Sequence, residues 1–392
     1  MAPSGNRGRQ GPLAPDPGGA ERWPPLPSDL PRRFVDMPPR HSRLPSAGRL
    51  AEFPLIEDLA RRFGTTGRSV LRGIGDDAAI LSPPSGDLFL LTTDLLAEGV
   101  HFDRTTATFE DIGYKAAVAN LSDIAAMGGT PRYLLVSLAI PAGHTQAEIR
   151  RLYRGMMSAC RPHRVELIGG DTSSSRQGLF INLTLAGTAK PGHALSRSGA
   201  RVGDLLYVTG TLGDSLAGLR LLKDAHGRPH RAGISLSKEA RRYLAERHLR
   251  PAPRLAVGQL LAKHRLATSA IDLSDGLSGD LAHICKQSRV GAELDMLTLP
   301  LSPACLDYAE ACRKNPFELA LAGGEDYELL VTVSPKNKTK VERLARSFGC
   351  RLSCIGRIQS QKRGLTVIEP DGSARKLAIT SYRHFEAPSS AR

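Results

Sequence analysis

The chain has 392 residues, of which 41% are hydrophobic and 23% are charged, and its formal net charge is +14. These proportions are typical of a globular protein, and the length is sufficient for two or more domains. No run of about 18 apolar residues occurs, so we expect neither a membrane span nor a membrane partner. Nucleic acid is not an expected partner either, because the Arg and Lys residues are dispersed and no helix-turn-helix, zinc-finger or RNP pattern occurs.

The six cysteines are scattered along the chain and form no CxxC pair. Their spacing completes no zinc site, so reduced structural thiols are the expected state. The N-terminal segment also lacks the apolar stretch of a secretory signal. These features together predict a cytoplasmic protein.

Residues 1–49 differ in composition from the rest of the chain. They contain eleven of the 27 prolines, many Gly and Arg residues, and no hydrophobic period. Such a composition cannot bury enough apolar surface to fold, so we expect a disordered tail.

From about Glu52 onward, helical and strand patterns alternate. In the first half, apolar periodicity predicts helices at 53–63, 109–129 and 148–161, and strands within 78–96, at 132–140 and at 180–189. After the turn-rich segment 191–204, the alternation resumes with 205–210, a helix at 215–222, helical segments in the 240s and 250s, a strand at 327–333, a helix at 340–348 and closing strands. This order predicts an α/β (α+β) fold with domains at 50–190 and 191–392.

Acidic residues recur in four segments that share one pattern, an apolar strand followed by Gly, Ser or Asp at the start of a turn or helix. The segments are GIGDDAAIL with Asp76 and Asp77, LTTDLL with Asp94, LIGGDTSSS with Asp171, and IDLSDGL with Asp272 and Asp275. A fifth acid, Asp123 in NLSD, is expected inside the helix at 109–129. Taken singly, each is explained as a helix N-cap or an Asp-Gly turn.

As a set, these carboxylates favour a metal site. The C-terminal ends of strands in α/β domains converge on one crevice, where several carboxylates repel one another unless a positive charge is present. A hard cation with oxygen ligands, Mg²⁺, suits this donor set, and the lack of clustered His or Cys argues against zinc. The two glycines and the hydroxyls of GGDTSSS suit a nucleotide phosphate held through such a metal.

Other nucleotide motifs do not account for the chain. RGIGDDAA matches the dinucleotide fingerprint by letter, but a pyrophosphate there would meet Asp76 and Asp77, and a strand rather than a helix follows. Neither a P-loop nor the protein-kinase HRD and DFG motifs occur.

The motifs as a series resemble the thiamine-monophosphate kinase family, within the aminoimidazole ribonucleotide synthetase superfamily. The resemblance covers about residues 52–385 and rests on GDDAA, TTD followed by GVHF, NLSD, LIGGDTS, RHLRPAPR, AIDLSDGLSGDL and GGEDYELL, in that order. It implies an N-terminal α/β domain whose sheet builds a β-barrel in a homodimer, and a C-terminal α/β domain. The ATP and metal sites are implied to lie between them.

The resemblance also implies a reaction, in which ATP phosphorylates thiamine monophosphate to thiamine diphosphate with several Mg²⁺ ions and no covalent enzyme intermediate. It assigns metal binding to Asp77, Thr92, Thr93, Asp94, Asp123, Asp171, Asp272 and Asp275. It assigns ATP contacts to Gly170, Asp171, Arg197 and Ser274, and substrate contacts to His101, Glu325 and Tyr382. Relatives often carry an aromatic residue near the adenine, and His163 is the nearest candidate here.

Several alternatives remain at this point. His101 and Tyr382 are also explained as structural residues, and Asp280 and Asp326 as helix and turn acids without a catalytic role. Another ATP-dependent activity of the superfamily (aminoimidazole ribonucleotide synthesis, selenophosphate synthesis or hydrogenase maturation) and a catalytically silent nucleotide- or thiamine-phosphate-binding protein are the competing functions.

Overall fold

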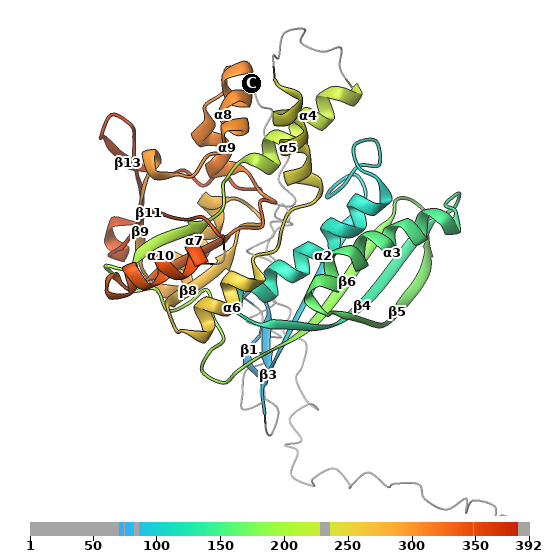
Figure 1. The fold of residues 1–392 in the computed structure, drawn as a ribbon, viewed down its shortest axis with the longest axis horizontal. Helices are drawn as coiled ribbons and strands as arrows, with labels where there is room; N and C mark the ends of the chain where they lie inside the picture. Colours follow the sequence, from blue (N-terminus) through green and yellow to red (C-terminus); the bar gives the residue numbers. More distant parts are fainter. Residues whose placement is uncertain (1–69, 74, 82–85, 228–235, 348, 383–392) are drawn as a thin grey trace, which may run out of the picture. The chain divides into compact units, whose positions relative to one another are not determined.

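The computed structural model describes residues 70–382 apart from 74, 82–85, 228–235 and 348. The expected tail at 1–49 and the expected helix at 53–63 lie outside these residues. The described residues form a mixed α/β fold with two sheets, which confirms the predicted fold class (Figure 1). None of the described helices is both long and apolar enough to cross a membrane.

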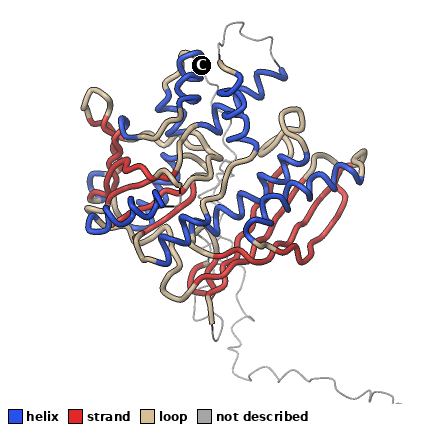
Figure 2. The backbone as a smooth tube through the Cα atoms, in the orientation of Figure 1, coloured by secondary structure: helices blue, strands red, loops and turns tan. Residues whose placement is uncertain are grey.

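The first sheet has six strands in the order β1-β2-β3-β6-β4-β5. Its strands are β1 (Val70–Arg72), β2 (Ala79–Leu81), β3 (Leu88–Ala97), β4 (Thr130–Pro141), β5 (Glu166–Ser175) and β6 (Phe180–Ala189). Only β4 and β5 pair in parallel, and the other neighbours are antiparallel. Helices α2 (Phe109–Ala126) and α3 (Gln146–Cys160) cover one face of this sheet (Figures 1 and 2).

Side chains on the two faces of the first sheet differ in exposure. Leu90, Val136 and Ile181 point toward the helices and are buried with them in one core. On the opposite face, alternate residues of the same strands are exposed although they are apolar. These are Phe89, Leu91 and Leu95 of β3, Leu135 of β4 and Phe180 of β6. A face of this composition on a sheet is typical of a surface that another protein covers.

Two glycines allow α2 and α3 to pack at backbone contact. A Cβ atom on Gly113 would lie 2.0 Å from the carbonyl oxygen of Leu152, and one on Gly155 would lie 1.9 Å from that of Glu110. Each helix begins with a capping box, Thr108 with Asp111 and Thr145 with Glu148, which satisfies N–H groups that the first helical turn leaves free. The position of α2 relative to the sheet is therefore closely fixed, and α2 carries Asp123.

The second sheet has seven strands in the order β13-β12-β9-β11-β7-β10-β8. They are β7 (Leu205–Thr209), β8 (Ala267–Asp272), β9 (Gly291–Asp295), β10 (Leu329–Val333), β11 (Leu352–Gln359), β12 (Leu365–Ile368) and β13 (Ala374–Lys376). The helices of this half are α4 (Asp214–Gly227), α5 (Lys238–Leu249), α6 (Leu255–Lys263), α7 (Leu277–Ser288), α8 (Pro303–Ala311), α9 (Pro316–Ala322) and α10 (Lys338–Ser347). Residues of α7 pack with one face of the sheet, and residues of α6 and α10 with the other.

The two halves share one core, because α2 also packs against the second half. A Cβ atom on Gly258 of α6 would lie 2.0 Å from the carbonyl oxygen of Ala125, and the Gln259 amide donates to the carbonyl of Gly129. The first half ends with β6 at Ala189. The predicted domain boundary near residue 190 remains a prediction.

One expectation about the acidic residues is only partly correct. We expected four acidic segments to follow the ends of strands, and two of them do: Asp76 and Asp77 lie in the turn after β1, and Asp272 ends β8 with Asp275 just beyond it. The other two segments do not fit, because Asp94 and Asp171 lie within β3 and β5. The expectation came from parallel sheets, whereas most strand pairs here are antiparallel and have no common C-terminal edge.

Candidate active site

Three carboxylates meet where the two halves pack together. Asp77 from the turn before β2, Asp123 from α2 and Asp272 from β8 each bring one oxygen within 4.8 Å of the others. We call these three residues the acid cluster. Thr92 donates a short hydrogen bond to Asp123 Oδ2, and it shares the inner face of β3 with Asp94. Asp123 lies within a helix, as expected.

The electrostatics of the acid cluster are unfavourable without a cation. Removal from water, followed by the charge of Asp94, raises the pKa of Asp123 well above its ordinary value. Burial and then Asp77 raise the pKa of Asp272 in the same way, and they raise that of Asp94 to about 6. These carboxylates therefore repel one another and bind protons until a positive charge compensates them.

Among the residues that the structure describes, Arg197 is the cation in direct contact with the acid cluster. Its Nη2 lies 2.7 Å from Asp77 Oδ1, and its Nε lies 3.1 Å from Asp77 Oδ2, so the contact is bidentate. The Arg197 backbone N–H donates to Asp76, whose pKa burial and Asp77 raise to about 6. A single guanidinium opposes several carboxylates, so the site remains acidic.

The acid cluster fits a hard divalent cation. Asp272 Oδ2 is buried and accepts no hydrogen bond from any described residue, which is unusual for a carboxylate oxygen. The converging donors are carboxylate oxygens, the ligand type that Mg²⁺ prefers. Sequence and geometry therefore agree on the class of ion that these residues can hold.

Two residues expected to bind metal lie apart from the cluster. Thr93 points to the opposite face of β3, where its hydroxyl donates to the carbonyl of Leu183. Asp171 is exposed on β5, three strands from β3, which corresponds to about 14 Å at the usual strand spacing. Gly170 precedes Asp171 on the same strand, and His163 ends the short 3₁₀ helix at Arg161–His163 that precedes β5. The predicted ATP contacts are thus divided between two regions.

A second charged group forms around Glu325. Lys115 Nζ of α2 lies 2.8 Å from Glu325 Oε1, and His248 Nδ1 of α5 lies 3.6 Å from Glu325 Oε2. Although burial opposes it, the charge of Lys115, followed by His248 and His101, lowers the pKa of Glu325. His101 itself accepts the backbone N–H of Ala97 through Nδ1. The two expected substrate contacts, His101 and Glu325, therefore lie close enough to interact.

The loop that carries Glu325 has a strained backbone. Glu325 and Tyr327 both have positive φ angles, 62° and 50°, which side chains other than Gly rarely adopt. The residues between and after them hold the loop in place. Asp326 accepts the N–H groups of Gly213 and Ser215, and Glu328 accepts from Thr209 and from two arginines.

Tyr327 connects the two charged groups. It is buried, and its pKa is raised by burial first and then by the charges of Glu325, Asp94 and Asp272. Tyr327, Lys115 and His248 were not among the residues predicted from the sequence. Lys115 gave the clearest available signal, because it is a lysine within the mostly apolar helical stretch YKAAVANL.

The segment after β8 lies between the acid cluster and Glu325. The carbonyl oxygen of Ser274 accepts the Glu325 N–H, and that of Asp275 accepts the Tyr382 N–H at 3.0 Å. Asp280 is buried in the first turn of α7 and accepts the N–H groups of Asp275 and Gly276. This confirms the expectation that Asp280 is a structural helix acid.

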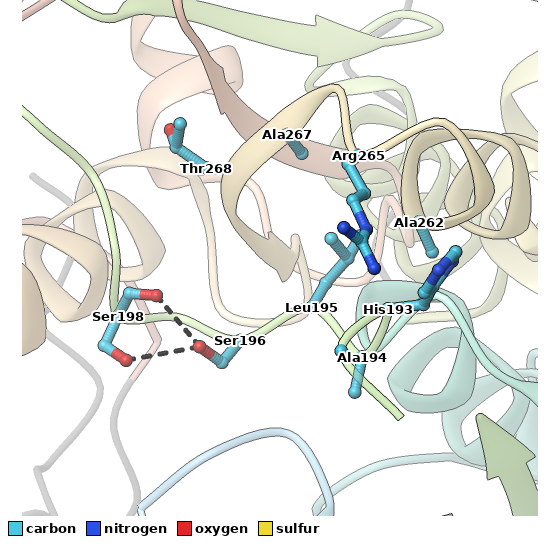
Figure 3. A pocket seen from close by; sticks show the side chains of 10 residues that line it. His193, Ala194, Leu195, Ser196, Ser198, Ala262, Arg265, Ala267 and Thr268 are labelled. Carbon is cyan, nitrogen blue, oxygen red and sulfur yellow. Dashed lines mark hydrogen bonds between the residues drawn. The ribbon is translucent and has the colours of Figure 1, made fainter. Parts of the chain in front are cut away.

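A hollow of about 300 Å³ lies behind the Arg197 segment (Figure 3). It is lined by residues on both sides of Arg197, among them Ser196 and Ser198, by Arg265 from the turn before β8, and by Thr268 of β8. The Ser196 hydroxyl donates to the carbonyl oxygen of Ser198 at 2.9 Å. None of the predicted site residues lines this hollow.

Comparisons with known proteins agree with these features. Residues 75–189 match the family model of the AIR synthase related protein N-terminal domain, and residues 201–368 match that of the C-terminal domain. Thiamine-monophosphate kinase of Escherichia coli (strain K12) is 40% identical over 339 residues, covering 86% of this chain and 99% of that protein. The Bacillus subtilis (strain 168) enzyme is 35% identical over 337 residues, with the same coverage.

A solved structure gives the same result. The structure described as "AaThiL complexed with AMPPCP and TMP" superposes with a TM-score of 0.73 and 34% identity, covering 88% of this chain and 100% of that one. Both the family models and relatives more than 30% identical thus span most of the chain. We conclude that the chain belongs to the thiamine-monophosphate kinase family of AIR synthase related proteins.

Proposed function

We propose that this protein transfers the γ-phosphoryl group of ATP to the phosphate of thiamine monophosphate, which gives thiamine diphosphate and ADP. The proposal rests on one observation, which is that the acid cluster and the Glu325 group lie next to each other in a chain of this family. A carboxylate cluster suited to metal-bound phosphates and an ionised Glu325 are joined by Tyr327 and by the segment after β8.

The residues suit a transfer between two phosphates. The acceptor oxygen of thiamine monophosphate is already ionised near neutral pH, so no strong general base is required. The main barrier is repulsion between two anions that must approach in line. Arg197 is held toward the site by its bidentate contact with Asp77, and its guanidinium supports negative charge on the transferring group.

The acid cluster, together with neighbouring residues, would hold the metal. Asp77, Asp94, Asp123, Asp272, Asp275 and Thr92 are the residues we assign to Mg²⁺, which when bound supplies the positive charge that neutralises the phosphates. In this role the carboxylates act as ligands, and no covalent intermediate with the protein is needed. Burial and mutual repulsion raise the pKa values of Asp94, Asp123 and Asp272, so binding of a cation would favour the ionised form in which they act as ligands.

The opposite end of the site would bind the thiamine moiety. Glu325 is ionised and about 28% of its side chain is exposed, so it can accept hydrogen bonds from, or face the positive charge of, a bound thiamine. His101 lies near it, and Tyr382 is tied to the backbone of Asp275. We assign substrate contacts to these three residues.

We also propose that the protein is a homodimer. The apolar outer face of the first sheet, with Leu91, Leu95 and Leu135, is the surface that a second copy would cover, and the sheet of each copy would supply half of a β-barrel. The position of Asp171 supports this arrangement. Gly170 and Asp171 are too far from the cluster of their own chain, so we assign them, with Thr93 and His163, to a site that the partner completes.

A cytoplasmic location and the lack of a nucleic-acid partner remain predictions. All six cysteines are free thiols, which supports a reducing compartment.

A test with two acceptors separates this function from its competitors. Purified protein with ATP and Mg²⁺ should convert thiamine monophosphate to thiamine diphosphate, and should leave free thiamine unreacted. Efficient phosphorylation of free thiamine would indicate a different kinase. Binding of both ligands without any thiamine diphosphate would indicate a silent binding protein.

A further inference from the structure

The group of side chains around Glu325 contains two buried residues to which no role has been assigned. Lys115 is only 4% exposed although lysine is almost never buried without a functional or structural partner. His248 is also buried, with 6% of its side chain exposed. Both contact Glu325, which we assign to the substrate, so their arrangement has a direct consequence for substrate binding.

The hydrogen-bonding pattern fixes the state of His248. Lys115 Nζ lies 3.4 Å from His248 Nε2, and an ammonium group can only donate, so Nε2 accepts and carries no proton. His248 Nδ1 lies 3.0 Å from Ser215 Oγ and holds the ring proton. Burial, and then the charge of Lys115, lower the pKa of His248 to about 4, which agrees with a neutral ring near neutral pH.

Three separate elements hold this group rigidly. Lys115 comes from α2 of the first half, His248 from α5 of the second half, and Glu325 from the strained loop before β10. Helices α4 and α5 pack at backbone contact, because a Cβ atom on Gly218 would lie 2.0 Å from the carbonyl oxygen of Leu244. His248 therefore has little freedom to move, and it supports the ammonium group of Lys115 from behind.

The three residues differ in exposure, and only Glu325 reaches the surface. Lys115 and His248 are covered, whereas about 28% of the Glu325 side chain is exposed. The carboxylate is thus held by Lys115 on its inner side and is open on its outer side. An ionised carboxylate held in this way is a fixed acceptor for a donor group or a positive charge on a ligand.

From this arrangement we propose that Lys115 and His248 are positioning residues that orient Glu325, and keep it ionised, for the thiamine end of the substrate. The proposal rests on the function proposed above. It assigns substrate selectivity to residues on both halves of the chain, neither of which needs to touch the substrate. It also explains why a charged lysine is buried on α2.

The direct test is Lys115→Met, which removes the charge and keeps most of the length of the side chain. The KM for thiamine monophosphate should rise about 10-fold or more, the effect of losing a charge-assisted contact, while the KM for ATP changes less than about 2-fold. The matched control is Arg250→Met. Arg250 pairs with Asp111 at 2.6 Å and so also connects the α5 end to α2, but it lies away from Glu325. The control should leave both KM values unchanged.

A double variant separates positioning from general stability. Once Glu325→Gln has removed the carboxylate, adding Lys115→Met should raise the KM for thiamine monophosphate less than about 2-fold further. Equal effects of Lys115→Met with and without the Glu325 carboxylate would overturn the proposal, as would a parallel rise in both KM values. If Lys115→Met does not fold, His248→Gln serves instead, and it should raise the KM for thiamine monophosphate selectively.

The wild-type protein shows whether a failure concerns the proposed function or only the role of Lys115. Wild-type protein that forms no thiamine diphosphate contradicts the proposed function itself. Active wild-type protein, combined with a Lys115→Met variant whose KM for thiamine monophosphate is unchanged, contradicts only the role of Lys115.

Discussion

At the scale of single residues, the site depends on carboxylates whose environment opposes their ionisation. Asp94 illustrates this, because burial and the neighbouring Asp77 raise its pKa to about 6. A lone buried carboxylate is costly to the fold, so its presence is best explained by a ligand that compensates it. The same reasoning applies to Asp123 and Asp272, whose pKa values are raised further.

The role of Asp94 leads to a first prediction. Asp94→Asn removes one ligand charge and keeps the size of the side chain, so the turnover number should fall by at least about 100-fold. The melting temperature should stay the same or rise, because one repulsive charge is lost from the free protein. Steady-state kinetics and differential scanning fluorimetry measure both quantities. Unchanged turnover would remove Asp94 from the metal site.

His248 leads to a prediction about pH. Its folded-state pKa of about 4 lies below the ordinary value of 6.5, so between these values the unfolded chain binds a proton that the folded chain excludes. The stability that neutral His248 contributes is present above about pH 6.5 and is lost as the pH falls toward 4. Lys115, Glu325 and Lys223 are the charged groups that influence it.

The measurement compares the melting temperatures of wild-type protein and His248→Gln across this pH range. The wild type should be the more stable near neutral pH, and its advantage should shrink as the pH decreases, because Gln does not titrate. An advantage that stays constant or grows at low pH would contradict a neutral, buried His248.

Individual residues were predicted from sequence to different degrees. Asp77, Thr92, Asp94, Asp123, Asp272 and Arg197 were predicted and do lie together. Lys115 and His248 were not predicted, because their roles depend on a contact between α2 and α5 that neither local pattern encodes. Tyr327 was missed for a similar reason, since its position follows from the positive φ angle of the strained loop.

At the scale of elements, the alternating pattern correctly predicted many of the described helices and strands, but not α8, α9 and β9, and not how the strands are connected. LIGGDTSSS was read as a strand end followed by a turn, yet it continues as β5 to Ser175. Runs of Gly and Ser usually indicate turns, and here pairing with β4 overrides that local preference. The strand order, which places β5 at the edge of the sheet, separates Asp171 from the other acids.

The contact between α2 and α3 gives an element-scale prediction. Gly155→Ala would place a Cβ atom against the Glu110 carbonyl oxygen, so the helices must separate, at a cost of about 1–3 kcal/mol. The melting temperature should fall, and activity should fall with it, because α2 carries both Asp123 and Lys115. Arg151→Ala, at an exposed position of α3, is the control and should change neither. An unchanged melting temperature of Gly155→Ala would show that the helices do not pack this closely.

At the scale of the whole molecule, the residues assigned to the site lie in two separate regions of one chain. The acid cluster and the Glu325 group lie within one chain, whereas Gly170 and Asp171 lie three strands away on an exposed edge. A homodimer built on the apolar face of the first sheet would resolve this separation. Composition and local patterns could not reveal it, because strand order is a property of the folded sheet.

Mixed dimers test this arrangement. Asp94→Asn and Asp171→Asn should each be nearly inactive, but a mixed dimer would have one site with both aspartates intact. Coexpression in equal amounts should therefore recover about a quarter of wild-type activity, since half of the dimers are mixed and each has one complete site. Recovery of no activity, in a preparation shown to contain mixed dimers, would place Asp171 outside the partner's site.

The proposed function requires that a carboxylate cluster, acting through a divalent cation, directs phosphoryl transfer between ATP and thiamine monophosphate. The most direct measurement is product identification for the wild-type protein, with Mg²⁺ present and after its removal by a chelator. Thiamine diphosphate and ADP should form in equal amounts with Mg²⁺, and neither should form after chelation until Mg²⁺ is restored. Release of ADP without thiamine diphosphate, or thiamine diphosphate formation that survives chelation, would contradict the account.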